Sequence, residues 1–302
     1  MAKAISKNKW LQYVLDHPEK SWNWSGITTN QNVTWEDIQA HPELPWDMHE
    51  ISYNPNITLE IVQQNPHIPW KYAGLSYSPN ITWEIVQANP DKAWDWYGIS
   101  RNSNITWDII QANPDKPWST HGFCKNLNIG WDILKENLVK GTRHEPFSWN
   151  PNITLDIILK HPEIEWDMTA ISHNPNLTWD EITTHKELRQ FRHCWMALSQ
   201  NPCITWEIIQ ANPDKPWDWE RVSINPNITW EIVDTNPYKP WDYMALSWNP
   251  MGPSLHQKNI EKRLEKESRE RCITRCKAFK EEMMMFYWHP DRYEKWAFDD
   301  DE

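Results

Sequence analysis

The sequence predicts an all-α protein built as an array of stacked short helix pairs. The main observation is a pair of residues, usually Thr-Trp, that recurs every 24 residues apart from one spacing of 27. Self-similarity at a fixed period is typical of arrays in which each unit buries its apolar face against its neighbours. The second observation is composition, since the 302 residues include 24 Trp and 23 Pro but only 7 Gly. The pairs are Thr34-Trp35, Thr58-Leu59, Thr82-Trp83, Thr106-Trp107, Gly130-Trp131, Thr154-Leu155, Thr178-Trp179, Thr205-Trp206 and Thr229-Trp230.

The first helix of a unit is clearest in the copy that begins at residue 80. Thr82 is expected to cap the helix, because its hydroxyl can accept from a free amide of the first turn. Glu84 follows in that turn, where the helix dipole favours a negative charge. Ile81 can pack back onto the helix as a hydrophobic staple. Pro90 restricts the residue before it, so we expect a helix of only about two turns.

A second, shorter helical segment is expected to open at Trp94 in the same copy. Ile99 is its apolar anchor, and apolar residues recur at that position in the other units. The residue before the anchor is usually Gly or Ala, which permits a close approach between helices. Glu50 and Arg221 are the exceptions, and they indicate a position near the surface. Neither helix can bury its apolar face alone, so the units must stack.

The predicted organisation is a repeat array over residues 1–250 and a different segment over residues 251–302. The array comprises nine or ten units, with residues 1–33 as an N-terminal capping unit. Two units depart from the pattern, near residues 137–147 and 185–194, and such departures map to loops that often carry function. Tolerated drift in a surface loop is the alternative. The final segment predicts a long amphipathic helix followed by an acidic tail.

The motif Asn-Pro-Asn-Ile-Thr-Trp-Glu-Ile-Val-Gln-Ala-Asn-Pro resembles the leucine-rich variant (LRV) repeat. That family has 24-residue units in which an α-helix alternates with a 3₁₀ helix, and its units stack into a right-handed solenoid. The Trp-rich form is similar to tandem-repeat proteins encoded by giant DNA viruses of amoebae, of the mimivirus and marseillevirus-like groups. The resemblance covers roughly residues 30–250. It implies a viral, non-enzymatic protein, located in the virion or in contact with host proteins.

Charge and hydropathy limit the classes of partner. Residues 1–250 hold 19 basic and 30 acidic residues, a net charge of −11, and residues 251–302 add −1 to reach −12. Because Lys and Arg supply most non-specific affinity for phosphates, nucleic acid is not an expected partner. The acidic charge suits solubility or a basic partner. No stretch has the length of apolar residues that a membrane helix needs, and no secretory signal is present. The five cysteines do not follow the repeat. We therefore expect a protein of the virion or the host cytoplasm that is not secreted.

Seven Asn-x-Thr triplets, such as Asn56-Ile57-Thr58, match the glycosylation sequon. Their Thr is better explained as a helix cap.

One variable position, between the Ser and the Asn of each turn, is the candidate interaction surface. Its neighbours hardly change, which is typical of an exposed position in a packed array. Stacking would line these side chains into a ridge, and Tyr, Trp and Arg are the types that dominate protein-binding hot spots. The alternative is that the larger side chains lean on the preceding unit and only pack. After Thr29, the ridge comprises Tyr53, Tyr77, Arg101, Lys125, Trp149, His173, Gln200, Ile224 and Trp248.

Other features carry weaker functional hypotheses. An Asp or Glu recurs in the first turn of each Thr-capped helix; a basic partner or a cation could use it, and the helix dipole also explains it. Met283, Met284, Met285 and Phe286 form a candidate docking face on the C-terminal helix, because Met-rich surfaces adapt readily; capping the last repeat is the alternative. His289-Pro290-Asp291 matches the tripeptide of J-domain co-chaperones, although most of that domain is missing; Pro290 as a helix stop is simpler.

No residue set predicts catalysis, a cofactor or a metal site, since no phosphate loop or nucleophile elbow occurs. We expect no small-molecule substrate. The predicted function is a structural or virion-associated scaffold that binds proteins. The alternative is an adaptor that binds a host protein, and a remote one is the co-chaperone fragment.

Overall fold

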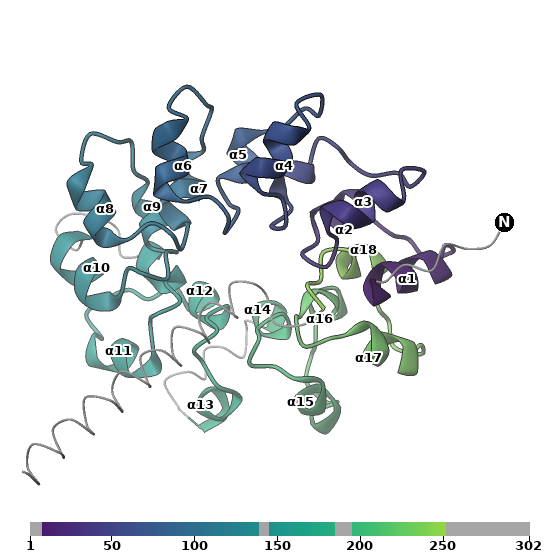
Figure 1. Ribbon diagram of the computed structural model, residues 1–302. Coiled ribbons are helices and arrows are strands. Elements are labelled where there is room, and N and C mark those ends of the chain that lie inside the picture. The colour runs from purple at the N-terminus through teal and green to yellow at the C-terminus, as the bar shows by residue number, and fades with distance from the viewer. Residues whose placement is uncertain (1–7, 139–144, 185–194, 252–302) are drawn as a thin grey trace, which may run out of the picture. The chain divides into compact units, whose positions relative to one another are not determined.

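The computed structural model describes residues 8–138, 145–184 and 195–251. They all belong to one compact unit, Met1–Leu255. Throughout these ranges the secondary structure is helical and contains no strand, which confirms the all-α prediction (Figure 1). The predicted C-terminal helix, its Met283–Phe286 face and the His289-Pro290-Asp291 motif lie outside the described residues.

Two series of helices alternate along the chain (Figure 1). The first series follows the recurring Thr, which Gly130 replaces in one unit and Asn8 in the first, and we call all its members the Thr-capped helices. They are α3 (Trp35–Ala40), α4 (Leu59–Gln64), α6 (Trp83–Ala88), α8 (Trp107–Ala112), α10 (Trp131–Leu138), α11 (Leu155–Lys160), α13 (Trp179–Thr184), α15 (Trp206–Ala211) and α17 (Trp230–Thr235), with α1 (Lys9–Asp16) in the same place in the first unit.

The second series has three to six residues in each helix and in most units follows the recurring Trp of the loop. It comprises α2 (Trp24–Thr29), η1 (Ile51–Tyr53), α5 (Tyr72–Leu75), α7 (Trp96–Arg101), α9 (Thr120–Phe123), η2 (Glu145–Trp149), α12 (Met168–Ser172), α14 (Trp195–Ser199), α16 (Trp219–Ile224) and α18 (Tyr243–Leu246). Among the described helices only η1 and η2 are 3₁₀ helices, so the α/3₁₀ alternation implied by the resemblance is found in two described units and the others pair two α-helices.

The Thr-capped helices begin as the sequence predicts, with one difference. Thr58, Thr106 and Thr229 occupy the N-cap with extended backbone, and each side chain accepts from the amide three residues on. Thr82 occupies the N-cap of α6 but makes no such bond to the helix. Its hydroxyl bonds Glu84 instead, and this bond is the main reason that the pKa of Glu84 is lowered.

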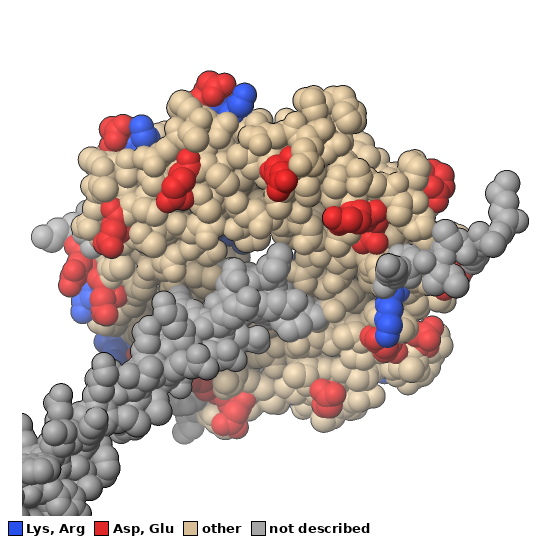
Figure 2. Space-filling model, in the orientation of Figure 1, with Lys and Arg blue, Asp and Glu red and all other residues tan. Residues whose placement is uncertain are grey.

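The acidic residues of the first turns are exposed all along the series. Figure 2 shows separate groups of Asp and Glu side chains over α3, α4, α6 and α8 on the face in view. The positions are Glu36, Glu60, Glu84, Asp108, Asp132, Asp156, Asp180, Glu207 and Glu231.

The recurring loop Trp does not open the second helix, so that prediction for Trp94 is wrong. The helix α7 begins two residues later, at Trp96, with Asp95 as its N-cap. Trp94 instead closes the loop, because its indole Nε1 donates to the carbonyl oxygen of Asn89 at 2.9 Å. Asn89 is the C-cap of α6. The same bond joins a loop Trp to the residue five positions earlier in most units, at 2.7–3.0 Å.

A column of asparagines joins each unit to the one before it. Asn225 is fully buried, and its Nδ2 donates to the carbonyl oxygens of Ser199, Asn201 and Ile204 at 2.9, 3.1 and 3.1 Å. Its Oδ1 accepts from the amide of Asn227 at 2.9 Å. Ten positions are equivalent, and all of them hold Asn except one, which holds Ser78. The members are Asn30, Asn54, Ser78, Asn102, Asn126, Asn150, Asn174, Asn201, Asn225 and Asn249. We call this set the Asn column.

The second asparagine of each Asn-Pro-Asn turn makes a similar bond. Asn56 Nδ2, for example, donates to the carbonyl oxygens of Gln31 and Val33 at 2.7 and 2.9 Å. A glycan would replace one of the two N–H donors of this nitrogen, so both bonds could not be kept, which argues against glycosylation of the Asn56-Ile57-Thr58 sequon in the folded protein.

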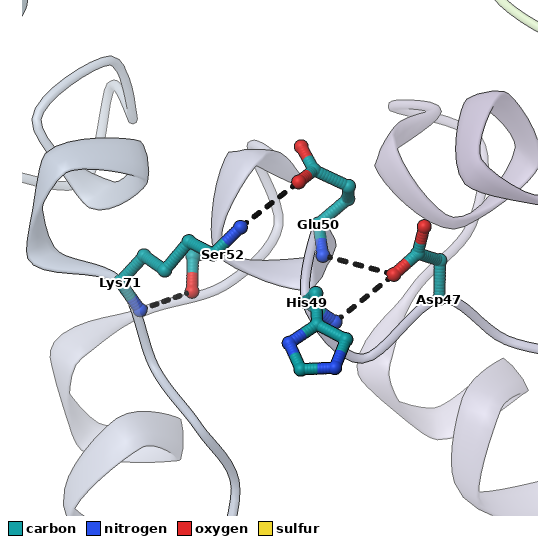
Figure 3. Close-up of polar contacts among 5 residues, drawn as sticks. All are labelled: Asp47, His49, Glu50, Ser52 and Lys71. Carbon is teal, nitrogen blue, oxygen red and sulfur yellow. Dashed lines mark hydrogen bonds and ion pairs between the residues drawn. The ribbon is translucent and has the colours of Figure 1, made fainter.

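A buried serine supplies a further link between units. Ser52 Oγ accepts from the amide of Lys71, nineteen residues later, at 2.8 Å (Figure 3). The bond recurs from Thr28 to Ser223 in the units whose partner residue is described, at 2.8–3.0 Å. One unit departs from the pattern at the position before the apolar anchor, where most units have Gly or Ala and this one has Glu50. The Glu50 carboxylate pairs with Lys71 Nζ at 2.9 Å (Figure 3).

The contacts continue from the last unit to the first, and this closure was not predicted from the sequence. Asn30 Nδ2 donates to the carbonyl oxygens of Ser247 and Asn249 at 3.0 and 2.8 Å. All the remaining members of the Asn column contact the unit that precedes them along the chain. The described units therefore form a closed circuit of contacts. The first unit, predicted as an N-terminal cap over residues 1–33, thus has a neighbour on both sides within its described residues.

The second helices form the more closely packed series. Extensive contacts join α7 to α9, α16 to α18, and α14 to α16. In a closed circuit, the series whose members lie closer together is the inner one. The core lies between the two series and consists of the apolar anchors, such as Ile99, and the residue before each Thr, such as Ile81.

Candidate interaction surface

The ridge residues lie at or just beyond the C-terminal end of the second helices, directly after a buried residue that is Ser in most units, Thr28 in the first and Cys124 in another. The Ser side chain points into the junction between units, so its neighbour along the helix points outward. Tyr53, Tyr77, Trp149 and Trp248 are 40%, 37%, 37% and 46% exposed, which is unusual for aromatic residues in this chain. The other members are Arg101, which is exposed, and Lys125, His173, Gln200 and Ile224, which are half-buried.

The structure brings ridge residues of successive units into contact. The ring centroids of Tyr53 and Tyr77 lie 6.1 Å apart. Further along, Lys125 Nζ lies 4.3 Å from the centroid of the Trp149 ring, and that ring lies 5.3 Å from the ring of His173. The ridge is therefore a continuous surface over at least these two stretches.

The aromatic members also pack, but on the following unit rather than the preceding one. A Cβ added to Gly74 would lie 3.1 Å from the Tyr53 ring, and one added to Gly98 would lie 3.0 Å from the Tyr77 ring. In these two units the glycine before the anchor makes room for one face of the ridge side chain. The other face remains exposed, so one ring serves both packing and surface.

Tyr77 has the most developed polar environment on the ridge. Its hydroxyl donates to Asp95 Oδ2 at 2.6 Å, and its ring lies 6.2 Å from that of Tyr97. Partial burial, followed by the bond to Asp95, raises the pKa of Tyr77 above its ordinary value. The phenol therefore stays protonated at neutral pH and presents a neutral aromatic face beside a carboxylate.

The described residues contain no group of three or more His, Cys, Asp or Glu side chains that could hold a metal ion. Burial raises the pKa of Cys124 and of Cys203 to about 12, so both free thiols are protonated at neutral pH. Within the ranges that the structure covers, no helix has the length and apolar character needed to cross a membrane.

Comparison with known proteins adds no relative. No protein-family model matches the chain, and no curated protein or solved structure matches it.

Sequence reasoning missed the role of the Asn column. The signal was present, because an Asn recurs at the period of the repeat just before each turn. The sequence pattern assigns this residue only to the turn, whereas the buried side chain bonds across the junction to the preceding unit.

Proposed function

We propose that this protein is a non-enzymatic scaffold that binds another protein through the ridge. The observation that supports the proposal is a set of partly exposed aromatic side chains at one repeated position, of which Tyr53, Tyr77 and Trp248 pack against a glycine of the next unit in the circuit. Rigid Tyr and Trp side chains lose little conformational entropy on binding, and they are enriched at binding hot spots. The proposal includes no catalytic residue, cofactor, nucleic acid, membrane or small-molecule substrate.

The charge of the array favours a basic partner protein. Its exposed first-turn carboxylates and net charge of −11 over residues 1–250 would steer such a protein toward the surface. We also propose that the helix pairs stack in a right-handed, solenoid-like arrangement, as the resemblance to LRV repeats implies.

The resemblance to the repeat proteins of giant viruses carries the viral part of the proposal. The main hypothesis is a structural or virion-associated component, comparable to a minor capsid or tegument protein. An adaptor of a host protein in the infected cytoplasm is the alternative. Proteomics of purified particles with chemical crosslinking separates them, because abundance and crosslinked viral neighbours support the first, whereas absence from particles with expression during infection supports the second.

The ridge itself is tested with a fourfold variant. Its substitutions are Tyr53→Ser, Tyr77→Ser, Trp149→Ser and Trp248→Ser. Hot-spot aromatics contribute about 2 kcal/mol each to binding, so we expect crosslinks to the main partner to fall at least about tenfold while the helical circular dichroism is kept.

The matched control replaces exposed apolar residues outside the ridge. Leu159, Met196, Tyr238 and Met244 are 41%, 53%, 75% and 55% exposed, and all four are changed to Ser. Loss of the partner in the control as well, or retention of the partner by a folded ridge variant, would contradict the proposal.

A further inference from the structure

The junction between the first and the last unit, which we call the seam, differs from all other junctions in one respect. Successive units along the chain are joined covalently, but α1 and α2 meet α17 and α18 only through non-covalent contacts. On the outer side, the rings of Tyr13 and Trp230 lie 5.8 Å apart. On the inner side, Trp22 meets Tyr243 edge to face at 5.3 Å.

Three kinds of polar contact found at the internal junctions recur at the seam. Ser247 Oγ accepts from the amide of Asn23 at 2.9 Å, as Ser199 Oγ does from Asp218 at 3.0 Å. Asn32 Nδ2 donates to the carbonyl oxygen of Pro250 at 2.7 Å. Its internal counterpart is the 2.7 Å bond from Asn227 to Pro202. Asn30 bonds the carbonyl oxygens of Ser247 and Asn249, as Asn225 bonds those of Ser199 and Asn201.

Shape also matches across the seam. A Cβ added to Gly26 would lie 2.9 Å from the ring of Trp248, much as a Cβ on Gly98 would lie 3.0 Å from the ring of Tyr77. Lys20 Nζ lies 4.8 Å from the centroid of the Tyr243 ring, and Lys92 makes the same kind of contact with Tyr72 at 5.4 Å.

Two surfaces that fit one another head to tail, and that belong to the same chain, can also join two chains. We propose that the seam is an exchangeable interface, and that its partner is a second copy of this protein whose first unit docks on the last unit of its neighbour. The proposal does not depend on the function proposed for the ridge, because it rests on the seam contacts, although Trp248 belongs to both surfaces. Tethering gives the first unit a high effective concentration, of about 1 mM for a short flexible connection, so the closed monomer dominates in dilute solution. Opening of the seam leaves both faces free, and they then pair between copies.

The experiment uses two full-length variants with complementary defects in the seam. Gly26→Leu places a side chain where the Trp248 ring lies, which blocks closure from the first unit. Trp248→Ala removes that ring from the last unit and leaves room for the added leucine. We expect each variant alone to remain monomeric at about 20 µM, well below the effective concentration of about 1 mM for tethered closure, and to melt about 5 °C below the wild type.

The two variants mixed in equal amounts are expected to form a dimer by size exclusion with light scattering. Its fraction should exceed that of either variant alone at least tenfold, because the leucine introduced into one copy fits the space that the missing indole leaves in the other. The double variant in a single chain should recover part of the lost melting temperature and stay monomeric in dilute solution.

The matched control moves the same pair of changes to an internal junction, as Gly98→Leu and Tyr77→Ala. Both lower the melting temperature, but their mixture is expected to stay monomeric, since that junction is covalently continuous. A monomeric mixture of the seam variants would overturn the proposal. So would unchanged melting of Gly26→Leu, since the seam would then be absent in solution.

Discussion

Asn225→Ala tests whether the Asn column holds the units together. The change removes two N–H donors that serve three buried carbonyl oxygens, and one acceptor that serves the amide of Asn227. A buried hydrogen bond contributes about 1 kcal/mol, and buried groups left without a partner add to the loss, so we expect a destabilisation of about 3–4 kcal/mol. For a domain of this size that corresponds to a fall in melting temperature of about 10 °C.

The measurement is urea unfolding followed by tryptophan fluorescence, with Asn236→Ala as the control. Asn236 Nδ2 donates to the carbonyl oxygen of Ile232 within its own helix end, at 2.9 Å, and makes no described contact across a junction. We expect the control to lose about 1 kcal/mol. If Asn225→Ala and the control lose the same stability, the bonds between units do not hold the array together.

Asn225→Asp sharpens the test through pH. The carboxylate keeps the acceptor for Asn227 but faces three carbonyl oxygens, and burial beside them raises the pKa of the introduced carboxyl in the folded state. A raised folded pKa gives stability that is present at low pH and lost as the pH rises through it. Relative to the wild type at the same pH, the variant is therefore expected to be weakest at pH 7 and to recover toward pH 4, whereas Asn225→Ala shows no such recovery.

Single residues carry three further predictions. Trp217→Phe removes the 2.8 Å bond from the indole to the carbonyl oxygen of Asn212, and we expect a loss of about 1 kcal/mol in urea unfolding. Gly122→Ala is expected to cost about 2 kcal/mol in the same assay, because the added Cβ would lie 2.6 Å from a buried Ser Cβ of the preceding unit. The Cys124 thiol, with its pKa raised to about 12, is expected to resist iodoacetamide at pH 7.5 until urea unfolds the protein, as followed by mass spectrometry of its peptide. The sign of the shift also means that Cys124 favours folding fully below the unfolded pKa near 9, and loses this contribution as the pH rises toward 12.

The sequence predicted the local structure well, because local signals decide it. Thr at the N-cap and Pro after the helix place α4, α8 and α17 within their observed bounds. The small residue before each anchor was also explained correctly, since Gly98 is packed against the preceding unit.

The contacts between units that are distant along the chain could not be predicted from the sequence. Closure depends on the small rotation from each unit to the next, summed along the whole array, and no residue pattern encodes that sum. The role of Trp94 was missed for a related reason. An indole that packs and an indole that donates to Asn89 have the same place in the sequence pattern, and only the geometry separates them. The ridge position was visible as a variable column, but its packing on the following unit was not.

Closure also constrains how the gene can change. Unequal recombination between tandem copies in the gene would add or remove 24 residues and preserve every local motif. In an open array such an event merely lengthens or shortens the protein. In this protein it would leave Asn30 out of register with Ser247 and Asn249, so closure fixes the number of copies that the fold can accommodate.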